Sequence, residues 1–99
     1  MKTGIELIAA ERQEQIEKHG ITLDIDIRTN TLNQLATGAG VLCVTDLDSR
    51  PPEVIRQNCP IGWHMPHWLK MANKPKKERL IIAGALIAAE IDRLQALEP

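Results

Sequence analysis

One segment near the end of the chain constrains the fold more than any other. Residues 83–97 read AGALIAAEIDRLQAL, and the stretch from Leu80 to Ile91 is apolar around most of the circumference of a helix. Such a helix usually lies at the centre of a protein and packs against neighbours on more than one side. Asn73 as N-cap and Pro75 in the first turn predict where it begins. The segment therefore predicts an all-α fold, a small helical bundle around its last helix.

The amino-acid composition is compatible with a helical fold and argues against some classes of partner. The 99 residues suggest one small domain, residues 1–99, and they include no Phe and no Tyr, so the core must be built from Leu, Ile, Val and Ala. The formal net charge of −1 favours neither nucleic acid nor a membrane surface as a direct partner. No apolar run reaches the ~18 residues that a membrane helix needs, and no secretion signal is recognisable. We expect a cytoplasmic protein whose two cysteines stay reduced.

Capping residues predict the first helix. Thr3 is a suitable N-cap with Glu6 as its capping-box partner, and apolar residues follow at helical spacing as far as Ile16. Gly20 would end this helix in the left-handed conformation. The next stretch, ITLDIDI, alternates like a strand but has no partner strand, so we expect residues 21–31 to form an extended loop whose Ile side chains dock on the bundle.

A second long helix is predicted from about Leu32 to Leu47, capped by Asn30 or Thr31. Its core face would use Leu35, Ala39, Val41 and Leu42, with Cys43 also in the core.

Prolines divide the segment between the two long helices. Residues 46–52 predict a turn, and Pro51 and Pro52 would begin a further helical turn. Residues 58–69 predict an ordered loop held by Trp63 and Trp68, with a short helical turn near residues 66–72.

Glu90 is unusual because it lies on a face that should be buried. A buried carboxylate is costly unless it is paired or bound to a metal. The first interpretation is an ion pair with Arg93, one turn away, or with Arg12, which interrupts the apolar stripe of the first helix. The second interpretation makes Glu90 a metal ligand that faces acidic residues from another helix.

The first helix supplies such acids. Glu11 and Glu14 lie three residues apart on one face, with Gln15 beside them. Together with Glu90 they would suit a hard cation, Mg²⁺ or Mn²⁺, which prefers oxygen ligands and bridges to phosphates. The alternative is that these residues form an ordinary solvated helix face.

Two further clusters could bind a ligand. Lys74, Lys76, Lys77 and Arg79 gather where the last helix begins, and a basic helix N-terminus suits phosphate, although a solvated helix start is the more common case. His64 and His67 are a weaker candidate for a metal pair, because Pro66 lies between them and no other ligand type is near.

Two stretches, IAAERQEQIEKHGIT and KPKKERLIIAGALIAAEIDRL, together give the chain a recognisable pattern. It resembles a family of small phage and bacterial proteins described as the N-terminal domain of dATP/dGTP diphosphohydrolases, related to the MazG-like all-α nucleotide pyrophosphohydrolases. The resemblance spans most of the chain. It implies a MazG-like helical fold, Mg²⁺ bound by carboxylates on bundle helices, and release of pyrophosphate from a (deoxy)nucleoside triphosphate, generally by dimers or larger assemblies.

The chain departs from that family at two places. Where the family tends to have GWT followed by an acidic, His-rich stretch, this chain has Ile21 in place of Trp and only Asp24 and Asp26 as acids, with Ile27 among them. Where the family has Glu before Leu, this chain has Gln34. An amide is a poor replacement for a carboxylate at a divalent metal, so the fold could persist without catalysis.

Two functions follow from these observations. As an enzyme, the chain would hold Mg²⁺ through Glu11, Asp26 and Glu90, with support from Glu14 or Gln15. Its substrate contacts would come from Lys74, Lys76, Gln34 and from Trp63 or Trp68. As a catalytically degenerate relative, it would bind a nucleotide or another protein. The apolar last helix leaves surface to cover, so we expect a homodimer in either case.

Overall fold

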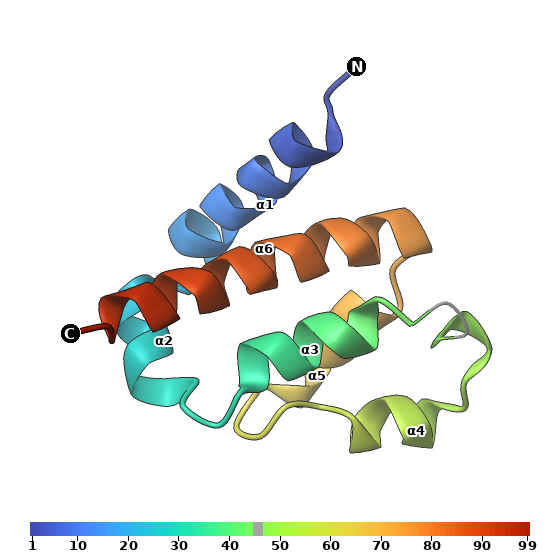
Figure 1. Ribbon diagram of the computed structural model, residues 1–99. Helices are drawn as coiled ribbons and strands as arrows, with labels where there is room; N and C mark the ends of the chain where they lie inside the picture. Colours follow the sequence, from blue (N-terminus) through green and yellow to red (C-terminus); the bar gives the residue numbers. More distant parts are fainter. Residues whose placement is uncertain (45–46) are drawn as a thin grey trace.

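The computed structural model describes residues 1–44 and 47–99, and these residues form an all-α bundle (Figure 1). The α-helices are α1 (Gly4–His19), α2 (Leu23–Thr29), α3 (Gln34–Leu42), α4 (Pro52–Gln57), α5 (Met65–Ala72) and α6 (Lys76–Ala96). A short 3₁₀ helix, Leu47–Ser49, precedes α4. None of the helices in the described part of the chain is long and apolar enough to cross a membrane.

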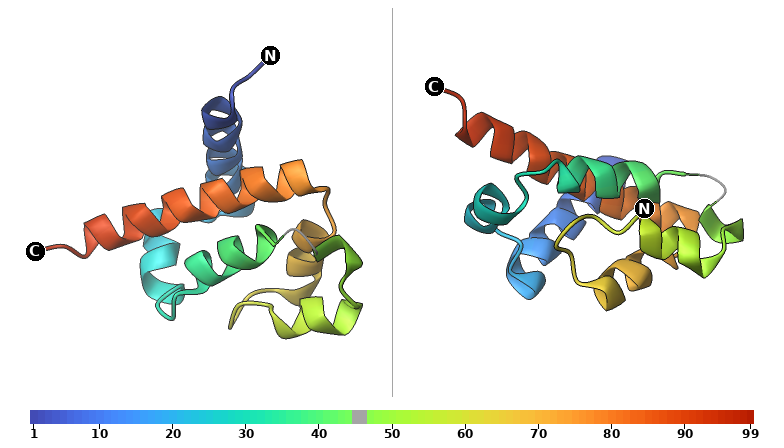
Figure 2. Two further views of the ribbon diagram at one scale, coloured as in Figure 1. Left: turned by 45° about the vertical axis from the view of Figure 1, so that its right-hand side comes forward. Right: turned by 90° about the horizontal axis from the view of Figure 1, so that it is seen from below.

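The last helix is the centre of the fold, as its apolar circumference predicted. Helices α1, α2, α3 and α5 all pack against α6, which crosses the whole molecule in both views of Figure 2. Its inward positions include Ala83, Ala85, Leu86 and Ala89, which are all buried. Because three of these four are alanine, neighbouring helices can approach the α6 backbone closely.

Helix α3 supplies the opposite wall of the core but is shorter than predicted. Leu35, Ala39 and Leu42 are buried as expected, whereas Val41 is only partly buried and Cys43 is exposed. The helix begins after Asn33, which has a φ of 65°, a conformation that Asn tolerates better than most residues. It ends where side chains from α6 take over its last carbonyls: Lys76 Nζ donates to Cys43 O and Arg79 Nη1 donates to Leu42 O. The rest of the predicted helix and turn includes residues 45–46, which lie outside the described residues.

The prediction of an extended loop at residues 21–31 was wrong. The segment forms α2, in which Thr22 Oγ1 accepts a hydrogen bond from Ile25 N at 3.3 Å. Of the Ile side chains expected to dock, Ile21 and Ile27 are half-buried and Ile25 remains exposed. The buried contacts come from Asp26 and Asn30, one helical turn apart, whose side chains hydrogen-bond at 2.8 Å. Because the buried residues of α2 are polar, the sequence shows no apolar repeat at helical spacing from which the helix could be predicted.

Capping predicted the remaining boundaries better. Thr3 and Glu6 form the expected capping box, and Gly20 ends α1 with a φ of 64°. Helix α4 begins at Pro52 as predicted. The prediction of Asn73 as the N-cap of the last helix was wrong, because Asn73 is the C-cap of α5 and α6 begins directly after Pro75, without a capping side chain. Residues 58–69 are less loop-like than expected, since α5 already begins at Met65 and forms two turns.

Gly84 allows α1 to rest on α6. A Cβ atom added there would lie 2.6 Å from Ile8 Cδ1, whereas one added at Gly40 in α3 would meet nothing within 4 Å. We expect Gly84→Ala to lower the free energy of unfolding by about 1 kcal/mol, because the overpacking cost of ~1–3 kcal/mol exceeds the gain in helix propensity. The matched control Gly40→Ala should raise the same quantity by about 0.5–1 kcal/mol. Urea unfolding followed by circular dichroism measures both, and stabilisation by Gly84→Ala would contradict the close contact.

Candidate functional site

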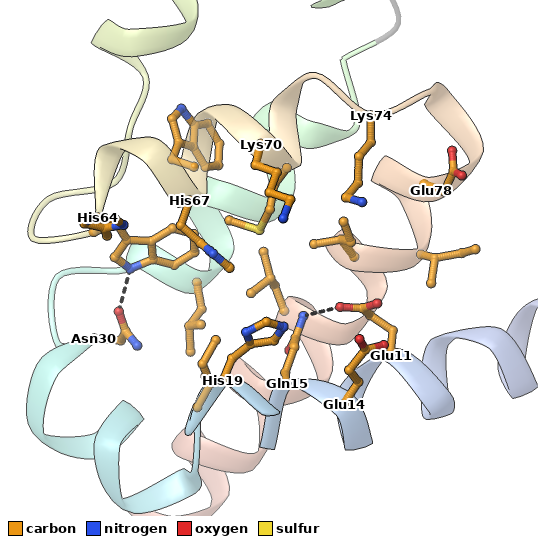
Figure 3. Close-up of a pocket in the computed structure, with 18 of the residues that line it drawn as sticks. Glu11, Glu14, Gln15, His19, Asn30, His64, His67, Lys70, Lys74 and Glu78 are labelled. Atoms are coloured by element: carbon orange, nitrogen blue, oxygen red, sulfur yellow. Dashed lines mark hydrogen bonds between the residues drawn. The ribbon is translucent and has the colours of Figure 1, made fainter. Parts of the chain in front are cut away.

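The main pocket lies between α1, α5 and α6. Its volume is about 770 Å³, within the range of about 300–1,000 Å³ that is usual for small-molecule sites. Leu7, Ile82, Leu86 and Met71 supply apolar lining, while charged and aromatic side chains surround the rest. Figure 3 shows these polar residues converging on one space from several elements.

One wall of the pocket is cationic. His64, His67, Lys70 and Lys74 line it at spacings of three, three and four residues, which places them along one side of α5 and the turn that follows. His19 at the end of α1 meets the ring of His67 edge-on, with ring centroids 5.2 Å apart. Burial lowers the pKa of His67, and the neighbouring His19, His64 and Lys70 lower it further. Lys70 and Lys74 therefore supply the positive charge with which this wall could bind an anion, since the lowered pKa of His67 favours its neutral form.

The facing side is acidic. Glu11 and Glu14 from α1 line it, and Figure 3 shows them side by side. Glu78 from α6 also lines the pocket but lies apart from them, beyond Lys74. Burial raises the pKa of Glu11, and the charge of Glu14 raises it further, against the opposing effects of Gln15, His19 and Lys74. Gln15 Nε2 donates to Glu11 Oε2 at 3.4 Å. Two carboxylates that disfavour each other's charge would gain from a cation between them.

Trp63 forms the aromatic end of the pocket. Its ring lies against α3, where a Cβ atom on Gly38 would come within 2.9 Å of the ring. Trp63 Nε1 donates to Asn30 Oδ1 at 2.9 Å, so the ring is held in a fixed orientation. Trp68 meets it edge-on, with centroids 6.0 Å apart. Trp68 is itself fully buried, and its Nε1 donates to Ile55 O. Trp63 is therefore the ring placed to meet a ligand, and Trp68 supports it.

Six of the residues predicted for the site meet in this pocket: Glu11, Glu14, Gln15, Trp63, Trp68 and Lys74. Lys76 lies elsewhere, since its ammonium donates to Cys43 O at 3.0 Å. The basic cluster predicted at the start of α6 is thus divided: Lys74 lines the pocket, Lys77 is exposed and Arg79 lies in the core. Arg79 is fully buried, and its guanidinium donates to backbone carbonyls and to Asp48.

Gln34 also lies outside the pocket and is buried. Its Oε1 accepts from Leu32 N at 2.7 Å, and its Nε2 donates to Thr29 O and Ile61 O. Both ends of the amide are therefore used to join the segment before α3 to the turn before α5. An acid at this position could not make the two donor contacts, because an ionised carboxylate only accepts.

The structure shows why a carboxylate is tolerated at Glu90, on a buried face of α6. Arg93 donates to both of its carboxylate oxygens, from Nε to Oε1 at 2.6 Å and from Nη2 to Oε2 at 3.1 Å. Both side chains are about 11% exposed, so the pair is largely desolvated. A two-pronged contact of this kind is the strongest geometry for an arginine and a carboxylate. The ion-pair interpretation with Arg93 describes the contacts of Glu90.

Asp26 lies in the same buried region as this pair. Arg12 Nη2 is 3.8 Å from Asp26 Oδ2, and Arg12 Nη1 donates to Ile21 O. Burial raises the pKa of Asp26, and the charge of Glu90 also raises it, whereas the hydrogen bond from Asn30 and the charges of Arg12 and Arg93 lower it. The acids Asp26 and Glu90 are thus accompanied by two arginines that provide opposite charge.

The predicted ligand set Glu11, Asp26 and Glu90 is not gathered at one point. Glu11 lines the pocket, whereas Asp26 and Glu90 lie outside it beside Arg12 and Arg93. Within residues 1–44 and 47–99, no group of three or more His, Cys, Asp or Glu side chains could hold a metal ion. The donor set that remains in the pocket is the pair Glu11 and Glu14, which suits a magnesium ion that arrives with phosphate oxygens.

Sequence reasoning missed several contributors to the pocket, among them His19, Asn30, Lys70 and Glu78. Lys70 continues the three-residue spacing of His64 and His67, a signal that becomes visible once residues 65–72 are recognised as a helix. His19 and Asn30 join the site only through the packing of α1 and α2, and no local pattern marks them. No family model, curated protein or solved structure matches this chain, so the geometry of the pocket carries the functional argument.

Proposed function

We propose that the chain binds a nucleoside triphosphate, as its magnesium complex, in the pocket between α1, α5 and α6. The observation that carries the proposal is the pairing of a cationic wall with two adjacent carboxylates beside a fixed tryptophan ring. Lys70 and Lys74 would bind phosphate oxygens, and Trp63 would stack on the base. Magnesium, or manganese in its place, would contact Glu11 and Glu14 while it remains bound to the phosphates.

Binding without cleavage is the version that the contacts favour. The resemblance stated from the sequence implies more acids at the metal, but Asp26 and Glu90 lie beside arginines and Gln34 is held by backbone groups. The pyrophosphohydrolase of the MazG-like type is the second candidate, and the Glu11–Glu14 pair favours it. In that function magnesium would polarise the phosphates, and the residues of this chain would orient the triphosphate.

Titration calorimetry with a panel of dNTPs, with and without Mg²⁺, tests the proposal. We expect Lys74→Met to weaken binding about tenfold, because it removes a charged donor to phosphate. Glu11→Gln should abolish the stimulation of binding by Mg²⁺ and leave metal-free binding no weaker, since it removes a negative charge. Lys77→Met is the matched control, because Lys77 is exposed and outside the pocket.

Pyrophosphate release measured on the same samples separates the two candidates. Binding without release supports the binding module, and Mg²⁺-dependent release that Glu11→Gln removes supports the hydrolase. Folded protein that binds no nucleotide under any condition would overturn both.

The homodimer expected from the apolar last helix is also a proposal. It does not depend on nucleotide binding, because the pocket and the exposed apolar residues of α6 share no side chain.

A further inference from the structure

Helix α6 carries exposed apolar side chains along one side. Leu80, Ile87, Ile91 and Leu94 are 42%, 47%, 51% and 49% exposed. These four side chains are separated by seven, four and three residues, and Gly84, between the first two, is covered by Ile8 of α1. The separations match the seven-residue repeat of a helix pair, in which each side chain enters a space between residues of the facing helix. The opposite face of α6 is occupied by the core, so the stripe is a second, separate apolar surface.

We propose that this stripe is the contact surface of a homodimer in which α6 pairs antiparallel with α6 of a second copy. A two-fold axis through Ile87 places Leu80 opposite Leu94 of the partner subunit and brings the two copies of Ile87 together. A two-fold interface must be self-complementary, and the spacing about Ile87 meets that condition. The stripe also extends along most of the helix, from its second turn to its last.

The charges at the two ends of α6 favour an antiparallel arrangement, and they favour a second copy of the chain as the partner. Lys77 is exposed at the start of α6 and Glu98 is exposed just after its end. The antiparallel pair brings Lys77 of each subunit near Glu98 of the other, whereas a parallel pair would place like charges together. The dipoles of the two helices also oppose each other favourably in the antiparallel pair. The chain therefore provides both of the complementary charges that pairing with a second copy requires.

Helix α1 leaves room for this pairing. Ile8 packs against Gly84, and beyond that contact the N-terminal part of α1 diverges from α6 in Figure 1 and in the left view of Figure 2. Ile5, which is 82% exposed, lies on this diverging part. The dimer surface would therefore be bordered by α1 rather than blocked by it.

Sedimentation equilibrium at micromolar concentration tests the surface. We expect a dimer for the native chain and a rise in its dissociation constant of about 30-fold or more for Ile91→Glu, the size of effect seen for central interface residues. Ile61→Glu is the matched control, because Ile61 is 69% exposed on the turn before α5, and it should dimerise like the native chain. A native monomer, or an Ile91→Glu chain that dimerises normally, would overturn the proposal. Nucleotide binding by the monomeric variant should be unchanged.

Disulfide crosslinking tests the direction of the helices without a disruptive charge. In a Cys43→Ser background, Ile87→Cys should form a linked dimer when treated with oxidised glutathione, because the axis passes through this position. Leu80→Cys should link poorly alone but efficiently when mixed with Leu94→Cys. Efficient linking of Leu80→Cys to itself would indicate parallel helices and overturn the antiparallel pair.

Discussion

Arg79→Met is expected to lower the free energy of unfolding by about 3–5 kcal/mol, one of the two strongest stability effects we predict. Arg79 is fully buried, and its guanidinium donates to Lys74 O at 3.0 Å, Leu42 O at 3.3 Å and Val44 O at 2.9 Å. Methionine would fill much of the space but leave Leu42 O and Lys74 O without this donor, at about 1–3 kcal/mol for each buried acceptor, whereas Val44 O keeps a hydrogen bond from Leu47 N at 3.4 Å. Because a domain of this kind is stable by only about 5–15 kcal/mol, the variant should be near the limit of folding.

Urea unfolding followed by tryptophan fluorescence and circular dichroism measures this loss. Lys77→Met is the matched control, since it removes an exposed cation from the same turn of α6 and should change the stability by no more than about 0.5 kcal/mol. Arg79→Lys should fall between the two, because an ammonium keeps the charge but lacks the planar set of donors. A loss below about 1 kcal/mol for Arg79→Met would contradict the role of Arg79 as the group that joins the end of α3 to the start of α6.

Arg93→Met is expected to lower the free energy of unfolding by about 3–5 kcal/mol, because it leaves the carboxylate of Glu90 largely buried and without its partner. The carboxylate would also lie near that of Asp26, whose pKa Glu90 already raises. Glu90→Gln should cost less, since the amide oxygen can still accept a hydrogen bond from Arg93. The double variant should lose clearly less than the sum of the two single losses, because the interaction can be lost only once.

Magnesium provides the control for this pair. If Glu90 served as a metal ligand, Mg²⁺ would raise the melting temperature of the native chain and not that of Glu90→Gln. We expect the same response to Mg²⁺ from both. Additive losses in the cycle, or a response to Mg²⁺ that Glu90→Gln alone removes, would contradict the ion pair as the reason that Glu90 is tolerated in α6.

Arg93 and Arg79 differ in how far their contacts could be predicted from the sequence. Arg93 lies three residues after Glu90, and residues at that spacing meet on a helix, so the pair was one of the interpretations open from the sequence. Arg79 carried no such signal, because two of its three backbone acceptors, Leu42 O and Val44 O, lie more than thirty positions away in the chain. Any sequence could offer those carbonyls, so only the packing of α3 on α6 decides which arginine meets them.

The same distinction separates the pocket residues. Glu11 and Glu14 could be grouped from their spacing on one helix, and Trp63 could be singled out as an unusual aromatic residue in this chain. That Glu11 faces Lys74 and not Glu90 depends on how α1 crosses α6, and the contact between Ile8 and Gly84 takes part in that crossing. The predicted metal ligands Glu11, Asp26 and Glu90 were grouped because all three are acidic. The way α1 crosses α6 places Glu11 in the pocket and leaves the other two outside it.

Local interactions are what the sequence by itself determined: the capping box of α1, the left-handed Gly20, the proline starts of α4 and α6, and the apolar circumference that places α6 at the centre. These depend on residues within about four positions of each other, where backbone geometry fixes which side chains can meet. The tertiary structure alone decided that residues 23–29 form a helix anchored by Asp26, that Arg79 is buried, and which acids share the pocket. Those outcomes depend on burial and on partners distant in the chain, which overcome weak local preferences.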